Sequence, residues 1–332
     1  MLRRGRVKYL WLLVFVGLTQ IKPAIAERIY PEAPIKIVVP YGAGGNADLA
    51  ARALSSAAPD LRALKGQPLI VINRASAGGL AGSESIVHAA NDGYTLLLAR
   101  VGSHAVEPAL DPATPYKWDS FAFIGLLQTD PYVCVVRADS SFKSFKDIIS
   151  AVRESPGKLS YATTGNMDAS VAFPVSAFVQ AGLSADAAVK IPYKSSPETT
   201  SALLGGFASF ACNALSPYLG SIRGGNLKAL VVSTPTRVAD LPDVPTVSEL
   251  GMKSLEAVSG WSALYGPPNL PEDIIRTWAS ALIELNHDDG WRAKVIGMGS
   301  IPSILSPDQT RQFAKDQYDF YRTLAPHMGI GK

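Results

Sequence analysis

The chain of 332 residues is long enough for two ordinary domains, and its 47% hydrophobic and 18% charged residues indicate a globular protein rather than a disordered one. Its formal net charge of +3 comes from the first 26 residues, which hold five of the 31 basic residues and none of the 28 acidic ones. The rest of the chain therefore carries a net charge of −2, which excludes the basic surface that a nucleic-acid-binding protein needs.

Residues 1–26 have the order of segments that is typical of a secretory signal peptide. Basic residues open the segment, an apolar run covers residues 10–18, and Ala24-Ile25-Ala26 provides a small-x-small cleavage site. The apolar run is shorter than the roughly 20 residues of a membrane-spanning helix. We therefore predict export of the mature chain to the periplasm; the alternative is an anchoring N-terminal helix.

Strands and helices alternate in the next part of the chain. Apolar runs predict strands at 35–40, 69–74 and 95–99, with helices at about 47–61 and around 86–90. This alternation predicts parallel strands joined by right-handed crossovers. Glycine-rich turns then lie at the carboxyl ends of the strands, where open α/β sheets bind their ligands.

Prolines and aromatic residues predict a loop at 107–123, and a second α/β unit follows it. The predicted elements are strands at 132–137, 158–164, 189–193, 209–213, 227–233 and 262–268, and helices at 144–155, 271–288, 291–299 and 307–326. We expect an α/β protein with two lobes and a ligand cleft between them. The first lobe would comprise residues 27–129 and 255–332 and the second residues 130–254, with hinges near 130 and 255.

The stretch VVPYGAGGNADLAARAL (38–54) places a glycine-rich turn between a strand and a helix. It lacks the lysine of a phosphate loop, and no acid follows at the distance that dinucleotide binding requires. Its backbone N–H groups suit a carboxylate, directly or through water; a tight turn without a ligand is the alternative. The candidate binding residues of this stretch are Tyr41, Gly42, Ala43, Gly44, Gly45 and Asp48. We interpret Asp48 mainly as a partner of the helix dipole and only secondarily as a ligand contact.

Other polar turns follow the later strands. In the first lobe the candidate ligand-binding residues are Ala77, Gly78 and Ser103, and in the second they are Thr163, Thr164, Gly165, Asn166, Tyr193, Ser195 and Asn213. Several of the hydroxyl groups have helix capping as an alternative role. Such a cleft has many hydrogen-bond donors and few titratable groups, which favours binding over catalysis. No cofactor or metal site is expected.

Cys134 and Cys212 are the only cysteines. Export permits a disulfide between them, but the surrounding apolar runs favour two buried free thiols.

Several stretches resemble the Bug-type solute receptors, the extracytoplasmic components of tripartite tricarboxylate transporters. They are VVPYGAGGNADLAAR, GQPLIVINRASAGGLAGSESIVHAANDGYTLLLA, SPGKLSYATTG, IPYKSSPETTSALLGG, LPDVPTVSELG and WSALYGPPNLPEDII. The resemblance implies a type II periplasmic-binding fold and delivery of the ligand to a membrane permease driven by an ion gradient. It also implies that backbone groups of Tyr41 through Gly45, with Ala77 and Gly78, hold water molecules that bridge to a ligand carboxylate. We expect a monomer.

The second-lobe turn departs from the family pattern. Where the family has G-x-G-S and a His-Leu pair, this chain has Gly165-Asn166-Met167-Asp168 and no histidine. Ligand specificity therefore cannot be transferred from the family. We interpret Asp168 as a residue of the helix's first turn, with an amino group of the ligand as its alternative partner.

Two other functions remain open at this point. An exported hydrolase or isomerase would need a nucleophile and a base, for which Ser103 with His104 or Cys134 with a histidine are candidates. A sensor that binds its ligand without transporting it would have the same sequence features.

Overall fold

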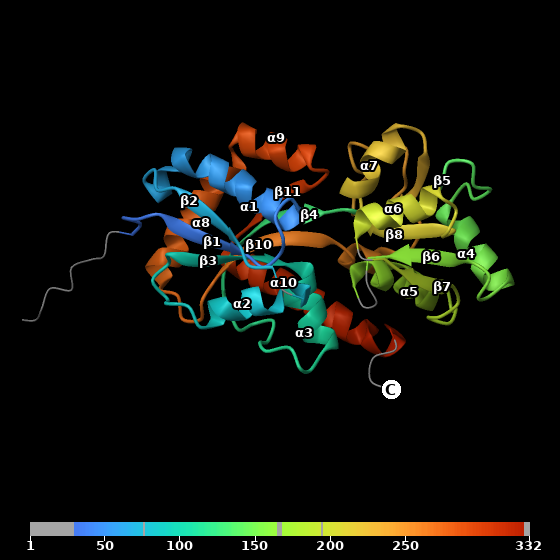
Figure 1. Ribbon diagram of the computed structural model, residues 1–332, viewed down its shortest axis with the longest axis horizontal. Coiled ribbons are helices and arrows are strands. Elements are labelled where there is room, and N and C mark those ends of the chain that lie inside the picture. The colour runs from blue at the N-terminus through green and yellow to red at the C-terminus, as the bar shows by residue number, and fades with distance from the viewer. Residues whose placement is uncertain (1–29, 76, 165–167, 194, 329–332) are drawn as a thin grey trace, which may run out of the picture.

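The computed structural model describes residues 30–328, except residues 76, 165–167 and 194. The strands of these residues form two separate sheets (Figure 1). The first has six strands in the order β11-β4-β10-β3-β1-β2, and the second has five in the order β7-β6-β8-β5-β9. Helices cover both sheets, so the predicted two-lobed α/β fold is confirmed. None of the described helices is long and apolar enough to cross a membrane.

The first lobe begins with the predicted parallel strands. Its strands are β1 (Ile35–Val39), β2 (Leu69–Asn73), β3 (Thr95–Arg100), β4 (Ala122–Asp130), β10 (Gly260–Gly266) and β11 (Ile301–Leu305). Its helices are α1 (Asn46–Ala57), α2 (Leu80–Val87), α3 (Glu107–Leu110), α8 (Glu272–Asn286), α9 (Asp289–Gly297) and α10 (Pro307–Leu324). Short helical turns are η1 (Ala58–Asp60), η2 (Arg62–Leu64), η3 (Ala77–Gly79), the π-helical η4 (Gly102–Val106), η5 (Lys253–Ala257) and η6 (Ala325–Met328). Strand β1 pairs in parallel with both β2 and β3, as predicted.

The second lobe is built from the middle of the chain. Its strands are β5 (Tyr132–Arg137), β6 (Ser160–Thr163), β7 (Val189–Pro192), β8 (Phe210–Ala214) and β9 (Leu227–Val232). Its helices are α4 (Phe145–Glu154), α5 (Ala169–Gln180), α6 (Ser196–Leu204) and α7 (Ser216–Arg223). Each of these strands was predicted to within two residues.

Two strands of the first sheet were not predicted. Strand β4 begins inside the segment expected to be a loop, and the same segment also contains α3. Strand β11 lies between two predicted helices. Both strands belong to the antiparallel side of the sheet, where β4 pairs with β10 and with β11. These partners are distant in sequence, so no local alternation with a helix marks the strands.

The chain crosses between the sheets twice. Strand β4 ends at Asp130 and β5 begins at Tyr132, which leaves one residue between the sheets. The chain returns near η5 and enters the first sheet where β10 begins at Gly260. In addition, α10 extends from the first lobe toward the second (Figure 1), and it contacts both β4 and α5. These crossings lie where hinges are expected, and the domain boundaries themselves stay a prediction.

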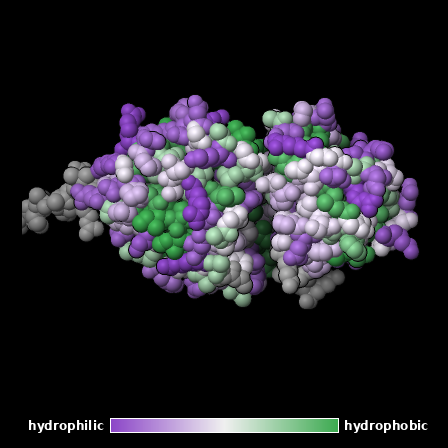
Figure 2. All heavy atoms as spheres, turned by 45° about the horizontal axis from the view of Figure 1, so that its top comes forward, coloured by the Kyte–Doolittle hydropathy of each residue, from purple (hydrophilic) through white to green (hydrophobic). Residues whose placement is uncertain are grey.

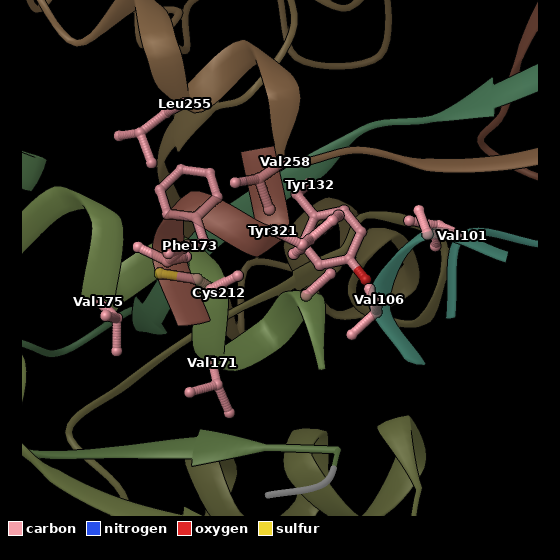
Figure 3. Close-up of a cluster of buried hydrophobic side chains, with 14 of the residues drawn as sticks. Val101, Val106, Tyr132, Val171, Phe173, Val175, Cys212, Leu255, Val258 and Tyr321 are labelled. Atoms are coloured by element: carbon pink, nitrogen blue, oxygen red, sulfur yellow. The ribbon is translucent and has the colours of Figure 1, made fainter. Parts of the chain in front are cut away.

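One hydrophobic cluster continues from one lobe into the other (Figure 3). The first lobe contributes Val101 and Val106, α5 of the second lobe contributes Phe173, and Tyr132 and Tyr321 lie between them. All five side chains are at most 8% exposed. The lobes therefore share a packed core beside the crossings.

The interpretation of Cys134 and Cys212 as free thiols is wrong. The two residues lie directly opposite each other in the antiparallel strands β5 and β8, and they form a disulfide. Sequence separation of 78 residues hides this pairing, because only the strand register brings the side chains together.

Candidate functional site

The first glycine-rich turn faces open space. Residues Gly42, Ala43, Gly44 and Gly45 are all exposed, and a Cβ added to Gly42 or Gly44 would meet no atom within 4 Å. Gly44 has a φ of +81°, a conformation that glycine adopts without strain. The N-cap of α1 is Gly45, which offers no side-chain cap. The N-terminus of α1, which is the positive end of the helix dipole, therefore lies beside an exposed turn.

Asp48 supports this turn from beneath. Its side chain is buried, and it accepts hydrogen bonds from the Gly44 amide at 2.9 Å, Arg52 Nε at 2.8 Å and Asn73 Nδ2 at 3.0 Å. Asn73 Nδ2 also donates to the Tyr41 carbonyl at 3.1 Å. The hydrogen bond from Arg52 is the main cause that lowers the pKa of Asp48 to about 2. Asp48 therefore supports the turn from inside the protein, and the Gly44 amide is satisfied by its carboxylate.

Tyr41 joins the three turns of the first lobe. Its hydroxyl donates to Ser103 Oγ at 3.1 Å and lies 3.4 Å from the Gly78 carbonyl. Its ring covers the glycines of the neighbouring turns, because a Cβ on Gly79 would lie 3.0 Å from Tyr41 Cζ and one on Gly102 would lie 3.3 Å from the hydroxyl. The structure thus brings Tyr41, Gly78 and Ser103 together.

Gly78 and Gly79 form the second turn with left-handed φ angles of +63° and +82°. Gly78 is exposed, whereas its neighbour Gly79 is buried under Tyr41. Ala77 opens this turn. The second turn therefore presents backbone next to the first, as expected from the sequence.

Ser103 lies inside the first lobe. It is fully buried, and its hydroxyl accepts from Tyr41 and lies 2.8 Å from Nδ1 of His104. Rings of Tyr116, Phe121 and Tyr265 surround the imidazole. Burial lowers the pKa of His104 to about 3, so the ring is neutral at physiological pH. The pair has the spacing of a nucleophile and its base, but both side chains are enclosed by protein.

The predicted donors of the β6–α5 turn mostly form hydrogen bonds with other residues of the same turn. Asp168 is the N-cap of α5 and accepts from the Ser170 amide at 3.1 Å. The Thr164 hydroxyl donates to Asp168, and the Thr164 amide donates to Ser170 Oγ at 3.0 Å. Thr163 is fully buried. Asp168 is therefore the N-cap of α5 and lies one residue before the first turn in which it was expected, while the candidates Gly165 and Asn166 lie outside the described residues.

The remaining second-lobe candidates have structural contacts too. Ser195 is the N-cap of α6, and its hydroxyl accepts from the Glu198 amide. Tyr193 donates its amide to the Thr163 carbonyl at 2.8 Å, and its ring packs against the hydrophobic cluster of the lobe. Asn213 is buried and donates to Ser196 Oγ at 3.4 Å. For Ser195, capping is thus the observed role.

An ion pair that was not predicted lies at the end of the first sheet. Arg100 Nη2 lies 2.8 Å from Asp130 Oδ2, and the two side chains are 14% and 4% exposed. Arg100 Nη1 also donates to Ser262 Oγ at 2.6 Å. The sequence feature that could have indicated this pair is a charged residue at the end of an apolar strand, as in TLLLAR and AFIGLLQTD. Few titratable groups were expected in the cleft, and this ion pair was not among them.

A groove separates the two lobes on the molecular surface (Figure 2). Strand β1 runs toward the second lobe, so the turn after it lies on the side of the groove (Figure 1). Beside it lie the second and third turns, which Tyr41 holds in place. The resulting site offers main-chain N–H groups and a helix N-terminus, an arrangement that binds anions.

Comparison with known proteins identifies the family. The family model described as "Tripartite tricarboxylate transporter family receptor" matches residues 52–329. Protein BugT of Bordetella pertussis is 32% identical over 312 residues, which are 92% of each chain. The solved structure of the periplasmic binding protein BugD is 27% identical, covers 91% of this chain and 99% of its own, and has a TM-score of 0.73. MatC from Rhodopseudomonas palustris, solved with bound malate, is 24% identical over 89% of this chain and 100% of its own, with a TM-score of 0.72. The chain therefore belongs to the receptor family of the tripartite tricarboxylate transporters.

Proposed function

We propose that this protein is a periplasmic receptor that binds a small carboxylate between its lobes and delivers it to a membrane permease. The observation that carries the proposal is the exposed turn of residues 42–45 at the uncapped N-terminus of α1, next to the groove. Membership of the receptor family supports it, and so does the malate bound to MatC. The leader of residues 1–26 supports the periplasmic location.

The physical basis of binding is the concentration of N–H donors at one end of a helix. A carboxylate placed there receives hydrogen bonds and the favourable field of the helix dipole without the need for a basic side chain. Closure of the lobes about the two crossings would remove the anion from water and strengthen these interactions.

The site is proposed to bind without chemical change. The one pair in it with the spacing of a nucleophile and base among the described residues, Ser103 and His104, is buried in the first lobe. Incubation of the protein with a bound acid for several hours, followed by mass spectrometry, should return the acid unchanged. A product that accumulates with time would favour an exported enzyme instead.

A thermal-shift screen tests the binding proposal. The panel contains mono-, di- and tricarboxylates, aromatic acids and amino acids, with matched amides and alcohols as neutral controls. At about 100 times its Kd a ligand stabilises the folded state by roughly 2.7 kcal/mol, which gives a clear rise in Tm. If no acid raises the Tm, or if the neutral analogues raise it equally, the carboxylate proposal is wrong.

A further inference from the structure

Glu107 places a carboxylate against the second glycine-rich turn. A Cβ added to Gly78 would lie 3.2 Å from Glu107 Oε1 and 3.7 Å from its Cδ, so the carboxylate lies against the bare backbone of this turn. Gly78 itself is exposed, and its carbonyl lies 3.4 Å from the Tyr41 hydroxyl, which links the second turn to the first. The carboxylate of Glu107 is therefore a neighbour of the backbone that the binding site presents.

The same residue lies on the side of the first lobe that is nearer to the second. Glu107 is the first residue of α3, and Figure 1 shows this helix beside the groove between the lobes. Val106, which directly precedes Glu107, contributes its side chain to the hydrophobic cluster that the lobes share (Figure 3). The side chain of Glu107 is partly exposed, so a molecule in the groove can reach it.

The carboxylate of Glu107 has no partner among the described residues. The hydrogen bond that Glu107 accepts from Thr114 Oγ1, at 3.1 Å, goes to its backbone carbonyl and not to its side chain. Burial raises the pKa of Glu107, and the negative charge of Asp111 raises it further. No cation contributes to this shift. Another negative charge in contact with this carboxyl group would favour its protonated form still more.

The neighbouring elements bring no positive charge to Glu107. Burial raises the pKa of Tyr41 and Tyr116 and lowers the pKa of His104 in η4, so all three side chains are neutral at physiological pH. The charged residue of α2 is another acid, Glu84, which acts on Tyr116 together with Glu107.

Helix α10 also packs against α3. Its charged residues lie at exposed or partly exposed positions and are not among the groups that shift the pKa of Glu107; they are Asp308, Arg311, Lys315, Asp316, Asp319 and Arg322.

An acid bound at the second turn would therefore meet a carboxylate that nothing neutralises. Two carboxylates that share a site repel each other when both are ionised, and one of them takes up a proton instead. A protonated carboxyl group is also a hydrogen-bond donor, whereas a carboxylate only accepts. One proton thus converts Glu107 from a repulsive neighbour of the ligand into a donor to it.

We propose that Glu107 takes up a proton from the solvent when an acid binds at the second turn, and that its protonated carboxyl group donates a hydrogen bond to the ligand carboxylate. Binding of the anion is then coupled to binding of a proton. The inference rests on the proposed function, because the acid has to bind in the groove. It concerns the dependence of binding on protons and not the choice between acids.

The sign of the pH dependence follows from linkage. The pKa of Glu107 is higher in the complex than in the free protein, so binding is tightest below the pKa of the free protein. Affinity then falls as the pH rises toward the pKa of the complex, because the free protein has to bind a proton that it does not yet carry.

Titration calorimetry between pH 6 and pH 8.5 tests the inference. The probe is malate or, where malate gives no binding heat, the acid of the thermal-shift panel that raises the Tm most. The Kd of the wild type should rise about fivefold or more across this range. Parallel titrations in phosphate and Tris buffers, which differ in ionisation enthalpy, should show a net uptake of up to about one proton per bound acid.

Glu107→Gln supplies an uncharged donor of nearly the same size. Its Kd should change little with pH, and at pH 8.5 it should bind the acid about threefold or more tightly than the wild type, because the repulsion is gone. Should E107Q not fold, Glu107→Ala also removes the charge, and its Kd should likewise lose the pH dependence of the wild type.

The matched control is Glu272→Gln. Glu272 is also the first residue of a helix, α8, but it is exposed. Helix α8 follows the end of β10 at Gly266, whereas the crossing between the lobes is at the start of β10, at Gly260. E272Q should therefore keep the Kd of the wild type and its dependence on pH.

Three results would overturn the inference. The first is a wild-type Kd that does not change with pH, without proton uptake. The second is a pH dependence that persists in E107Q, because the proton would then bind to the ligand or to another residue. The third is weaker binding by E107Q at pH 8.5, because Glu107 would then accept a hydrogen bond from a donor of the ligand. In all three cases an acid still binds and the proposed function stands. If no acid of the panel binds, the proposed function falls, and the inference falls with it.

Discussion

Replacement of Asp48 by asparagine tests whether the glycine-rich turn is held from beneath. The carboxylate accepts three hydrogen bonds, and its pKa falls from its usual 3.8 to about 2, chiefly because of Arg52. This fall corresponds to about 2.5 kcal/mol at roughly 1.4 kcal/mol per pKa unit. Arg52 is 55% exposed, so solvent screening reduces the expected contribution to about 1–2 kcal/mol.

The lowered pKa of Asp48 also determines how the stability difference between D48N and the wild type changes with pH. A carboxyl group whose pKa is lower in the folded state contributes its full stability above the unfolded pKa of about 4 and loses it as the pH falls toward 2. The D48N variant should therefore unfold in urea with a free energy about 1–2 kcal/mol below the wild type at pH 7. The difference should shrink between pH 4 and pH 2, as far as both proteins stay folded.

The matched control is Asp273→Asn. Asp273 is an exposed acid in the first turn of α8. Its replacement by asparagine is therefore the same chemical change at the start of a helix, but without buried partners. This variant should differ from the wild type by no more than about 0.5 kcal/mol. Equal losses in D48N and D273N, or a D48N deficit that does not change with pH, would refute the support role of Asp48.

Three further outcomes follow from the same structure. Tyr41→Phe removes the hydrogen bond from the hydroxyl to Ser103 but keeps the ring. Loss of a hydrogen bond worth about 1 kcal/mol should weaken binding of the tightest acid several-fold in calorimetry, with little change in Tm. An unchanged Kd would contradict the role of the hydroxyl. Replacing both Cys134 and Cys212 by serine should lower the free energy of unfolding by about 2–5 kcal/mol, and an unchanged urea midpoint in oxidised and reduced protein would contradict the disulfide. Burial lowers the pKa of His104 to about 3, so the unfolded chain gains a proton below about pH 6.5 that the folded chain does not, and stability should fall as the pH drops from about 6.5 toward 3. His104→Gln should flatten this slope in urea titrations, and a slope equal to that of the wild type would contradict it.

The parts of the fold that sequence predicts are those with a local signal. IKIVV, LIVIN and TLLLAR alternate with helices, and this alternation determines the parallel order of β1, β2 and β3. Strands β4 and β11 have no such neighbour, since their hydrogen bonds go to distant segments of the chain. Their positions depend on tertiary pairing, which a single sequence does not display.

The candidate site shows the same division between local and distant contacts. The glycine turns were predicted from their own residues, and helix capping was an alternative to ligand binding for Ser195, which the structure shows as an N-cap. The link from Tyr41 to Ser103 spans 62 positions, and Arg100 meets Asp130 across β10. Residue types alone can identify these side chains as candidates for polar contacts, but their partners depend on the arrangement of the strands.

The inward orientation of several predicted ligand contacts has a physical cause. A turn that directs its N–H groups outward leaves its other polar groups in need of partners beneath it. Asn73 satisfies the carbonyl of Tyr41, and Asp48 fixes the Gly44 amide, so the outer face of the turn is set before any ligand arrives. Preorganisation of this kind lowers the entropy that binding has to overcome. Residues that never touch the ligand should therefore control affinity through the shape of the turn.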